Sequence, residues 1–261
     1  MDNSITNDMM YKMIFKRKSF HIFKDVGKIE DSELRRIEES FKSFVPLDED
    51  IKVGMKIVPQ SETTCKRGAE YCVLLYSEER GNYLQNIGYI GEQLDLYLAS
   101  MDIGALWFGI GKTEETLEGL SYVIMIAISK MPGDKFRKDM FKSKRKPLGE
   151  VWDGNLIEGV TDIVRFAPSA CNTQPWKVHC EIGDEGKVNL DIYRYKKPGK
   201  KGIMPAAKVT YYNRIDIGIF LLFLDVCLKH KGVVAERVLM SDFEGDDEEF
   251  TMLAKYRLIS C

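Results

Sequence analysis

Apolar residues in the first half of the chain recur at helical spacing in some stretches and form uninterrupted runs in others, and these two patterns predict helices and strands. Residues 31–44 place apolar side chains on one helical face behind an acidic start, and Pro46 follows them. Residues 87–102 form a second helical face, with Gly104 predicted as the carboxyl cap of that helix. Uninterrupted apolar runs instead predict buried strands at 71–76 and 122–128.

The same kinds of pattern start over after residue 150. Residues 217–230, IGIFLLFLDVCLKH, predict a helix that is apolar nearly all round, so we expect it to be buried. The other elements predicted here are a helix at 156–166, strands at 176–180, 188–193 and 252–259, and an acidic turn at 244–249.

Two short matches relate the first half to the second. Residues 44–46 (FVP) match 166–168 (FAP), each at the end of a predicted helix, and Ile90-Gly91 with Leu94 matches Ile217-Gly218 with Leu221. The offset changes only from 122 to 127 between the two matches. Short apolar matches also arise by chance, so the repeat is a hypothesis. It divides the chain into halves at 1–150 and 151–261.

Composition excludes several classes of protein. The chain has 261 residues, 44% hydrophobic and 30% charged, which is ordinary for a globular protein. The longest apolar stretch, 103–111, is half the roughly 18 residues that a membrane-spanning helix needs, so we expect no membrane partner. The amino terminus lacks the basic-then-apolar order of a signal peptide, and we expect a cytoplasmic protein.

Charge adds no strong preference for a partner. The chain has 38 Lys and Arg against 40 Asp and Glu, so the net charge of −2 predicts no nucleic-acid partner. Two basic segments, 135–146 and 196–201, are either solvated surface or local contacts for an acidic partner. Six cysteines form no CxxC pair and three histidines are scattered, so neither a metal site nor a disulfide framework is predicted.

The most specific string is APSACNTQPW at residues 167–176. It can be an ordinary polar turn whose Asn and Gln bond their own backbone. It can also be a turn, stiffened by Pro168 and Pro175, that presents amides to a planar heteroaromatic ligand. The string resembles the APSxxNxQPW signature of the nitroreductase family, FMN-dependent oxidoreductases of α+β fold.

Three further stretches resemble the same family. Residues 17–23 (RKSFHIF) resemble its amino-terminal RRSxRxF, residues 88–111 resemble its central helix and glycine-rich exit, and residues 145–150 (RKPLGE) resemble its carboxyl-terminal RxPxxE. Their order departs from the family, because the carboxyl-terminal motif closes the first half and APSxxNxQPW follows it.

The resemblance implies a site shared between family subunits. In the family homodimer one subunit holds the FMN phosphate and the partner's PSxxN turn touches the flavin ring. Here residues 45–50, the counterpart of that turn in the first half, lack the Asn and Gln, and the second half lacks the RRS motif. We therefore expect two pseudo-symmetric halves, each with a small mixed sheet packed by helices, that mimic the homodimer within one chain. The chain is then a monomer or weak homodimer with one FMN in a cleft between the halves.

Candidate cofactor-binding residues follow from the matched motifs. The planar fork of Arg17, the hydroxyl of Ser19 and the guanidinium of Arg145 suit a phosphate clamp, unless residues 16–18 are a solvated basic turn. His21 lies near the flavin's pyrimidine end or is a surface histidine. Cys171 fills a variable motif position and is expected to pack. The full set is Arg17, Lys18, Ser19, His21, Gly109, Arg145, Pro168, Ser169, Asn172 and Gln174.

The predicted activity is that of an FMN-dependent NAD(P)H oxidoreductase. Hydride passes from NADH or NADPH to FMN and then to a nitroaromatic, a quinone or a similar small-molecule acceptor. The flavin carries the chemistry, so no catalytic side chain is predicted. Two alternatives stay open: a flavin-binding or small-ligand-binding protein without turnover, and an interaction module that uses residues 135–146.

Overall fold

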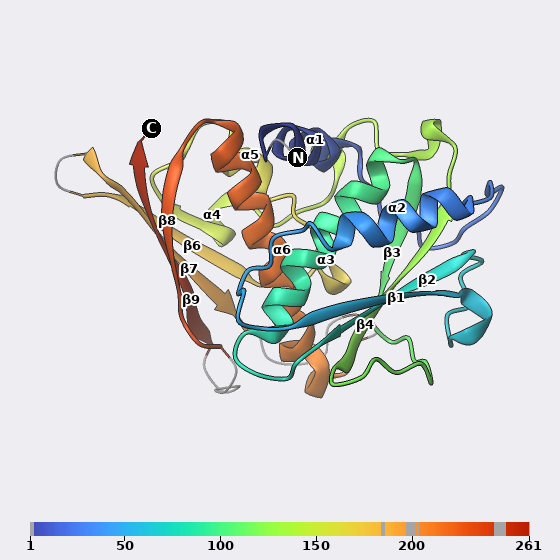
Figure 1. Cartoon of the computed structure of the whole chain (residues 1–261). Helices are drawn as coiled ribbons and strands as arrows, with labels where there is room; N and C mark the ends of the chain where they lie inside the picture. The colour runs from blue at the N-terminus through green and yellow to red at the C-terminus, as the bar shows by residue number, and fades with distance from the viewer. Residues whose placement is uncertain (1–2, 184–185, 197–201, 203, 243–248, 261) are drawn as a thin grey trace. The chain divides into compact units, whose positions relative to one another are not determined.

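The chain folds into two compact units. The computed structural model describes residues 3–183, 186–196, 202, 204–242 and 249–260 (Figure 1). Unit 1 comprises Met1–Tyr11 and Phe141–Cys261, and unit 2 comprises Lys12–Met140. Helix α1 (Asn3–Lys16) begins in unit 1 and ends in unit 2. The division differs from the predicted halves, because residues 141–150 pack with the second half.

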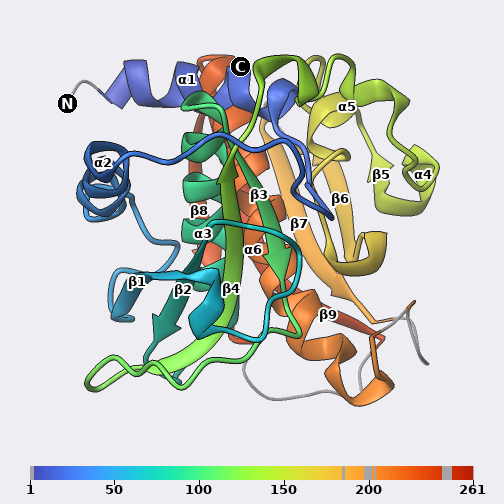
Figure 2. The ribbon, with the colours of Figure 1, turned by 90° about the vertical axis from the view of Figure 1, so that its right-hand side faces the viewer.

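Unit 2 is an antiparallel sheet with a long helix along one face (Figure 2). The sheet has four strands in the order β1-β2-β4-β3, and all three pairings are antiparallel. The expectation of a mixed sheet is therefore wrong for the named strands of this unit. The helices are α2 (Asp31–Phe41) and α3 (Tyr83–Ser100), and the strands are β1 (Val53–Pro59), β2 (Tyr71–Ser77), β3 (Ile103–Phe108) and β4 (Ser121–Lys130).

The predicted elements of unit 2 form for the expected reason, which is burial of their apolar runs. Strands β2 and β4 coincide with the two predicted buried strands, and Leu74 and Ile126 are fully buried in them. Helix α2 is confirmed but ends at Phe41, and helix α3 starts four residues before the predicted 87. Strand β1 and strand β3 were not predicted.

Gly104 does not cap α3, which is a correction. The helix ends at Ser100, Asp102 adopts the left-handed conformation at φ 56°, and Gly104 is already the second residue of β3. A Cβ on Gly104 would lie 2.5 Å from Met131 Cγ and 2.8 Å from Phe20 Cδ2. Glycine is needed here because neighbouring side chains approach the strand closely, and its backbone conformation is ordinary.

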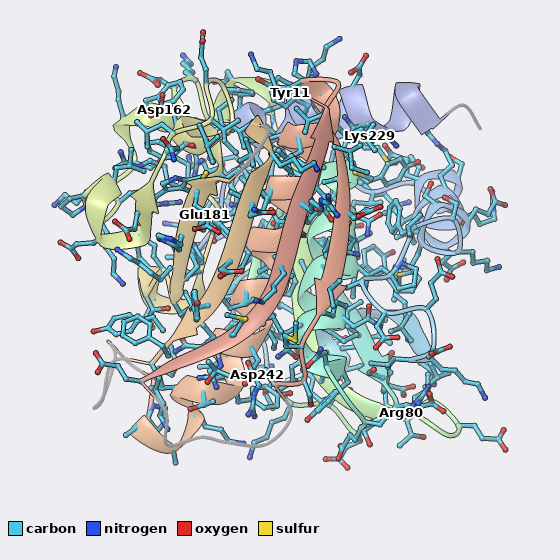
Figure 3. The ribbon with its side chains drawn as sticks, turned by 90° about the vertical axis from the view of Figure 1, so that its left-hand side faces the viewer. Tyr11, Arg80, Asp162, Glu181, Lys229 and Asp242 are labelled. Carbon is cyan, nitrogen blue, oxygen red and sulfur yellow. The ribbon has the colours of Figure 1, made fainter. Side chains whose placement is uncertain are left out.

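Unit 1 is a five-stranded mixed sheet packed on one long helix (Figure 1). Its order is β5-β6-β7-β9-β8, with β5 parallel to β6 and the other pairings antiparallel. Figure 3 looks onto the outer face of this sheet, which carries Glu181, with α6 behind it. The strands are β5 (Trp152–Gly154), β6 (Trp176–Ile182), β7 (Val188–Tyr195), β8 (Val234–Leu239) and β9 (Phe250–Ser260), and the helices are α4 (Leu148–Val151), α5 (Thr161–Val164) and α6 (Val209–His230).

Helix α6 is buried along most of its length, as its apolar sequence predicts. It begins at Val209, eight residues before the predicted start. The apolar pattern did not include these first two turns because they carry polar side chains. The predicted helix at 156–166 is reduced to the four residues of α5. The predicted acidic turn at 244–249 and the basic segment 196–201 fall largely outside the described residues.

The two units share an internal topology. Each has two strands, a central helix and two more strands in chain order, and the four strands lie in the equivalent orders β1-β2-β4-β3 and β6-β7-β9-β8. Helices and strands together make the α+β class predicted from sequence. Among the described residues, no helix combines the length and apolar character that crossing a bilayer requires.

We predict that Gly91→Ala destabilises the protein. A Cβ at this position of α3 would lie 2.6 Å from Trp107 Cη2 and 3.0 Å from Leu75 Cδ1. Overpacking of this kind costs about 1–3 kcal/mol, more than the ~1 kcal/mol that alanine gains in a helix. Urea unfolding should therefore show a lower midpoint. Gly149→Ala in α4, where nothing lies within 4 Å of the added Cβ, is the matched control and should not lose stability. Equal midpoints for the two variants would contradict the packing argument.

Candidate functional site

Arg17 is a buried ion-pair residue of unit 2. Its side chain is 2% exposed, and its Nε and Nη2 donate to Asp95 Oδ2 at 3.1 and 2.8 Å. Nε also lies 3.4 Å from Glu92 Oε1. A phosphate dianion at this guanidinium would also approach the Asp95 carboxylate, which repels it. The structure therefore gives Arg17 a structural role, and its expected phosphate-binding role stays a prediction.

The charged groups around Arg17 shift one another's pKa values. Burial disfavours its cationic form, but Asp95 and Glu92 outweigh burial and raise the pKa of Arg17. Burial also raises the pKa of Glu92 well above its usual range, against the opposing effect of Arg17. Trp107 donates its Nε1–H to Asp95 Oδ2 at 3.1 Å. The cluster thus ties α3 to β3 and to the segment that follows α1.

The other amino-terminal candidates of unit 2 are accessible. Lys18 is exposed and donates to the Lys135 carbonyl at 3.1 Å, and His21 is exposed. Ser19 is half-buried and pairs with Ala105 of β3 in a parallel bridge. Gly109 is half-buried directly after β3.

The signature string forms a turn of unusual backbone conformation in unit 1. Cys171, Asn172 and Gln174 have φ values of 49°, 54° and 46°. Such left-handed conformations cost non-glycine residues on the order of 1–3 kcal/mol each, so the surrounding contacts must hold the turn in place. We call residues 167–176 the signature turn.

Hydrogen bonds from several directions hold the signature turn. The backbone N–H of Gln174 donates to Ser169 Oγ at 2.9 Å, and the backbone N–H of Ala170 donates to Asp216 Oδ1 at 2.8 Å. Gln174 is 2% exposed; its Oε1 accepts from the Lys146 amide at 2.8 Å and its Nε2 donates to the Asn172 carbonyl at 3.2 Å. Gln174 is therefore part of the turn's internal framework.

Arg145 joins the signature turn in unit 1. Its Nη2 donates to the Phe166 carbonyl at 2.8 Å, and its Nη1 donates to Asn172 Oδ1 at 3.2 Å. The structure thus brings together residues from two motifs that are separate in sequence, RKPLGE and APSACNTQPW. Residues 141–150 lie in unit 1 because Arg145 and Lys146 bond this turn.

The exposed edge of the turn carries polar groups. Asn172 and Cys171 are exposed, while Pro168 and Ser169 are half-buried. Cys171, which was expected to pack, is exposed. Asn172 Oδ1 accepts from Arg145 and from Gln174 Nε2, and Asn172 Nδ2 donates to the Lys144 carbonyl at 3.2 Å, so the amide is held in place and keeps a second N–H for a ligand.

Asp216 is the residue of this site that sequence reasoning missed. It lies on α6, is 3% exposed, and receives hydrogen bonds from Ala170 N and Thr173 Oγ1, the latter at 3.3 Å. Burial raises the pKa of Asp216 to about 8, although both hydrogen bonds oppose the shift. The available signal was an aspartate directly before the apolar run at Ile217.

Unit 2 has a corresponding turn without the exposed amide. The Leu47 amide donates to Asn86 Oδ1 at 2.8 Å, and Gln93 Nε2 donates to the Val45 carbonyl at 2.7 Å. Asn86 lies 127 residues before Asn213, the offset of the helix match, and Thr173 Oγ1 contacts Asn213 Oδ1 at 3.5 Å. In both units an Asn of the central helix contacts the turn that directly precedes the first of the four equivalent strands, β1 in unit 2 and β6 in unit 1.

The part of the chain that the structure describes contains no group of three His, Cys, Asp or Glu residues placed to hold a metal ion. The site is therefore described by its amides, hydroxyls and guanidinium.

Comparison with known proteins identifies the family. The model of a family described as "Putative TM nitroreductase" matches residues 9–227, and the chain belongs to this family. A search of curated proteins found no match. A solved structure described as a "putative nitroreductase" from Thermotoga maritima MSB8 is 16% identical, with a TM-score of 0.56, over 96% of this chain and 93% of that one. It shares the fold.

Two smaller solved structures resemble about half of the chain. A "putative nitroreductase in complex with FMN" from Desulfovibrio desulfuricans is 17% identical, with a TM-score of 0.40, over 54% of this chain and 93% of that one. A "Putative NADH dehydrogenase/NAD(P)H nitroreductase" from Bacteroides thetaiotaomicron VPI-5482 is 15% identical, with a TM-score of 0.41, over 52% of this chain and 94% of that one.

We predict that Arg17→Met destabilises the fold. Removing the cation leaves Asp95 and Glu92 buried without it, and breaking a buried pair in this way costs about 3–5 kcal/mol. The free energy of unfolding in urea should fall by that amount. Lys18→Met, which removes a neighbouring exposed cation, should change it by less than about 1 kcal/mol. If both variants unfold at the midpoint of the parent protein, Arg17 does not have the structural role described here.

Proposed function

We propose that the chain is an FMN-dependent oxidoreductase that takes hydride from NADH or NADPH and reduces a nitroaromatic, a quinone or a similar acceptor. Family membership supports the class of oxidoreductase. The single observation that carries the proposal is the signature turn, in which exposed Asn172 lies in contact with Arg145. Both residues match positions of the family's flavin-binding motifs.

The groups on the turn fit a flavin. An isoalloxazine edge alternates carbonyl acceptors with N–H donors, and the second N–H of the Asn172 amide can donate to such a carbonyl. The Arg145 guanidinium suits an anionic group of the cofactor, while Ser169 and Pro168 complete the turn's half-buried edge. FMN, when bound, supplies the capacity to accept and pass on a hydride. The protein's own residues bind the ring and fix its orientation.

The roles of Lys18, Ser19, His21 and Gly109 remain proposals from the motif matches. Lys18 and Ser19 offer an ammonium and a hydroxyl for the phosphate beside Arg17, which is itself paired with Asp95 and Glu92. His21 is exposed and is a candidate for the pyrimidine end of the flavin.

We also propose that the chain arose by internal duplication. The equivalent strand orders of the two units and the matching positions of Asn86 and Asn213 support this origin. The turn of unit 2, residues 45–50, has neither the Asn nor the Gln of the signature. One flavin per chain follows from this difference.

A purified sample tests the proposal against its alternatives. FMN should bind, and anaerobic addition of NADH or NADPH should bleach the flavin absorbance. Binding without bleaching by either nucleotide would favour a flavin-binding protein without turnover. Failure to bind FMN would favour the interaction module, although Arg145 and Lys146 of its basic segment already bond the signature turn.

We predict that Asn172→Ala alters bound flavin. Loss of a hydrogen bond to the ring should shift the flavin's absorbance bands and change its reduction potential, while weakening binding by about 0.5–1.5 kcal/mol. Spectra and potentials of parent and variant measure this. Asn155→Ala, at another exposed asparagine of unit 1, is the control. Unchanged spectrum and potential in Asn172→Ala would mean that the turn does not touch the ring.

A further inference from the structure

Asp216 is the only carboxylate that hydrogen-bonds the signature turn among the described residues. Its side chain is buried on α6, where most buried residues are apolar, and its chain neighbours Ile215 and Ile217 are 2% and 0% exposed. Isolating a carboxylate from water in this way is expensive unless it is paired or neutral. Its hydrogen-bond partners, Ala170 and Thr173, are both neutral.

The number of hydrogens that the Thr173 hydroxyl can donate indicates whether Asp216 is protonated or ionised. The Thr173 hydroxyl has one hydrogen, yet its Oγ1 lies 3.3 Å from Asp216 Oδ2 and 3.5 Å from Asn213 Oδ1, both of them acceptors when Asp216 is ionised. A proton on Asp216 Oδ2 satisfies all three groups. Asp216 then donates to Thr173, Thr173 donates to Asn213, and Asp216 Oδ1 still accepts from the Ala170 amide.

We propose that Asp216 is the positioning residue of the signature turn and that it acts as the neutral acid, donating to Thr173 through Oδ2 and accepting from Ala170 through Oδ1. These two contacts bracket Cys171 and Asn172, the strained part of the turn. Asp216 therefore acts through the turn backbone and fixes where the Asn172 amide points.

The burial of Asp216 agrees with this role. Its pKa is raised to about 8 from a reference near 3.9. The proton therefore contributes stability that is fully present below about pH 4 and is lost as the pH rises through about 8. The other titratable or charged groups on the turn, on residues 144–146 that bond it and on the first two turns of α6 are Cys171, Lys144, Arg145, Lys146, Tyr211, Tyr212 and Arg214. Burial and Cys171 together raise the pKa of Tyr212.

Three variants test whether Asp216 holds the turn as a neutral acid or as a carboxylate. Asp216→Asn keeps an acceptor toward Ala170 and a donor toward Thr173, and so reproduces the proposed form at every pH. Asp216→Ala removes both contacts. Asp225→Asn is the matched control on the same helix, where the carboxylate pairs with Arg237 and accepts from Tyr256 instead.

Amide NMR on flavin-free protein between pH 5 and 9.5 provides the readout. In the parent, the Ala170 and Thr173 amide signals should shift with a midpoint near 8, and in Asp216→Asn that transition should be absent. Asp225→Asn should titrate like the parent. The Ala170 amide should exchange with solvent within about threefold of the parent rate in Asp216→Asn and at least tenfold faster in Asp216→Ala, the factor for losing about 1.4 kcal/mol.

The opposite pattern would overturn the proposal. If Asp216 holds the turn as a carboxylate, the parent has no proton to lose, and its Ala170 and Thr173 amide signals should stay as constant between pH 5 and 9.5 as those of Asp216→Asn. The parent should then show no transition near pH 8. Should Asp216→Ala fail to fold, the titration of the parent against Asp216→Asn still decides between the two forms.

The consequence for flavin rests on the proposed function and is measured separately. FMN should bind Asp216→Asn within about threefold of the parent and Asp216→Ala at least tenfold more weakly. If the NMR pattern is as expected but no variant binds FMN, the positioning role stands and the proposed function fails. Equal FMN affinity in all variants would show that the turn's position does not matter to the flavin.

Discussion

The structure depends on one constraint: each unit buries a long helix almost completely, so the polar side chains on that helix need partners inside the protein. In α3 these groups are Asn86 and Gln93, which bond residues 45–48, and Asp95 with Glu92, which hold Arg17. In α6, Asn213 and Asp216 bond the signature turn. The buried helices therefore position the loops on which the proposed function relies.

The signature turn combines strain with exposure. Three residues in left-handed conformations are held by buried partners, whereas the Asn172 amide at the exposed edge is supported by Arg145. A turn fixed in advance loses little entropy when it binds a ligand. The corresponding turn of unit 2 keeps the support from its central helix and lacks the amide, which is why the proposed flavin site belongs to one turn.

Sequence patterns predicted the parts of the structure that depend on continuous apolar runs. Strands β2 and β4 and the burial of α6 follow from hydrophobicity alone, and the family motifs identified the class of protein. They failed where tertiary contacts decide: Gly104 serves close packing, and the helix predicted from residue 217 left out Asp216. They also did not predict the buried pairing of Arg17 with Asp95. A motif match fixes a residue's position in the chain, and it leaves the partners of its side chain undetermined.

The number of FMN molecules bound per chain tests the central claim most directly. Equilibrium titration of protein of known concentration, followed by flavin fluorescence, should saturate at one equivalent, because one turn carries the Asn172 amide with its Arg145 support. Asn172→Ala should weaken that single phase without revealing another. Saturation at two equivalents, or binding of full strength that is unaffected when the signature turn is altered, would contradict the account.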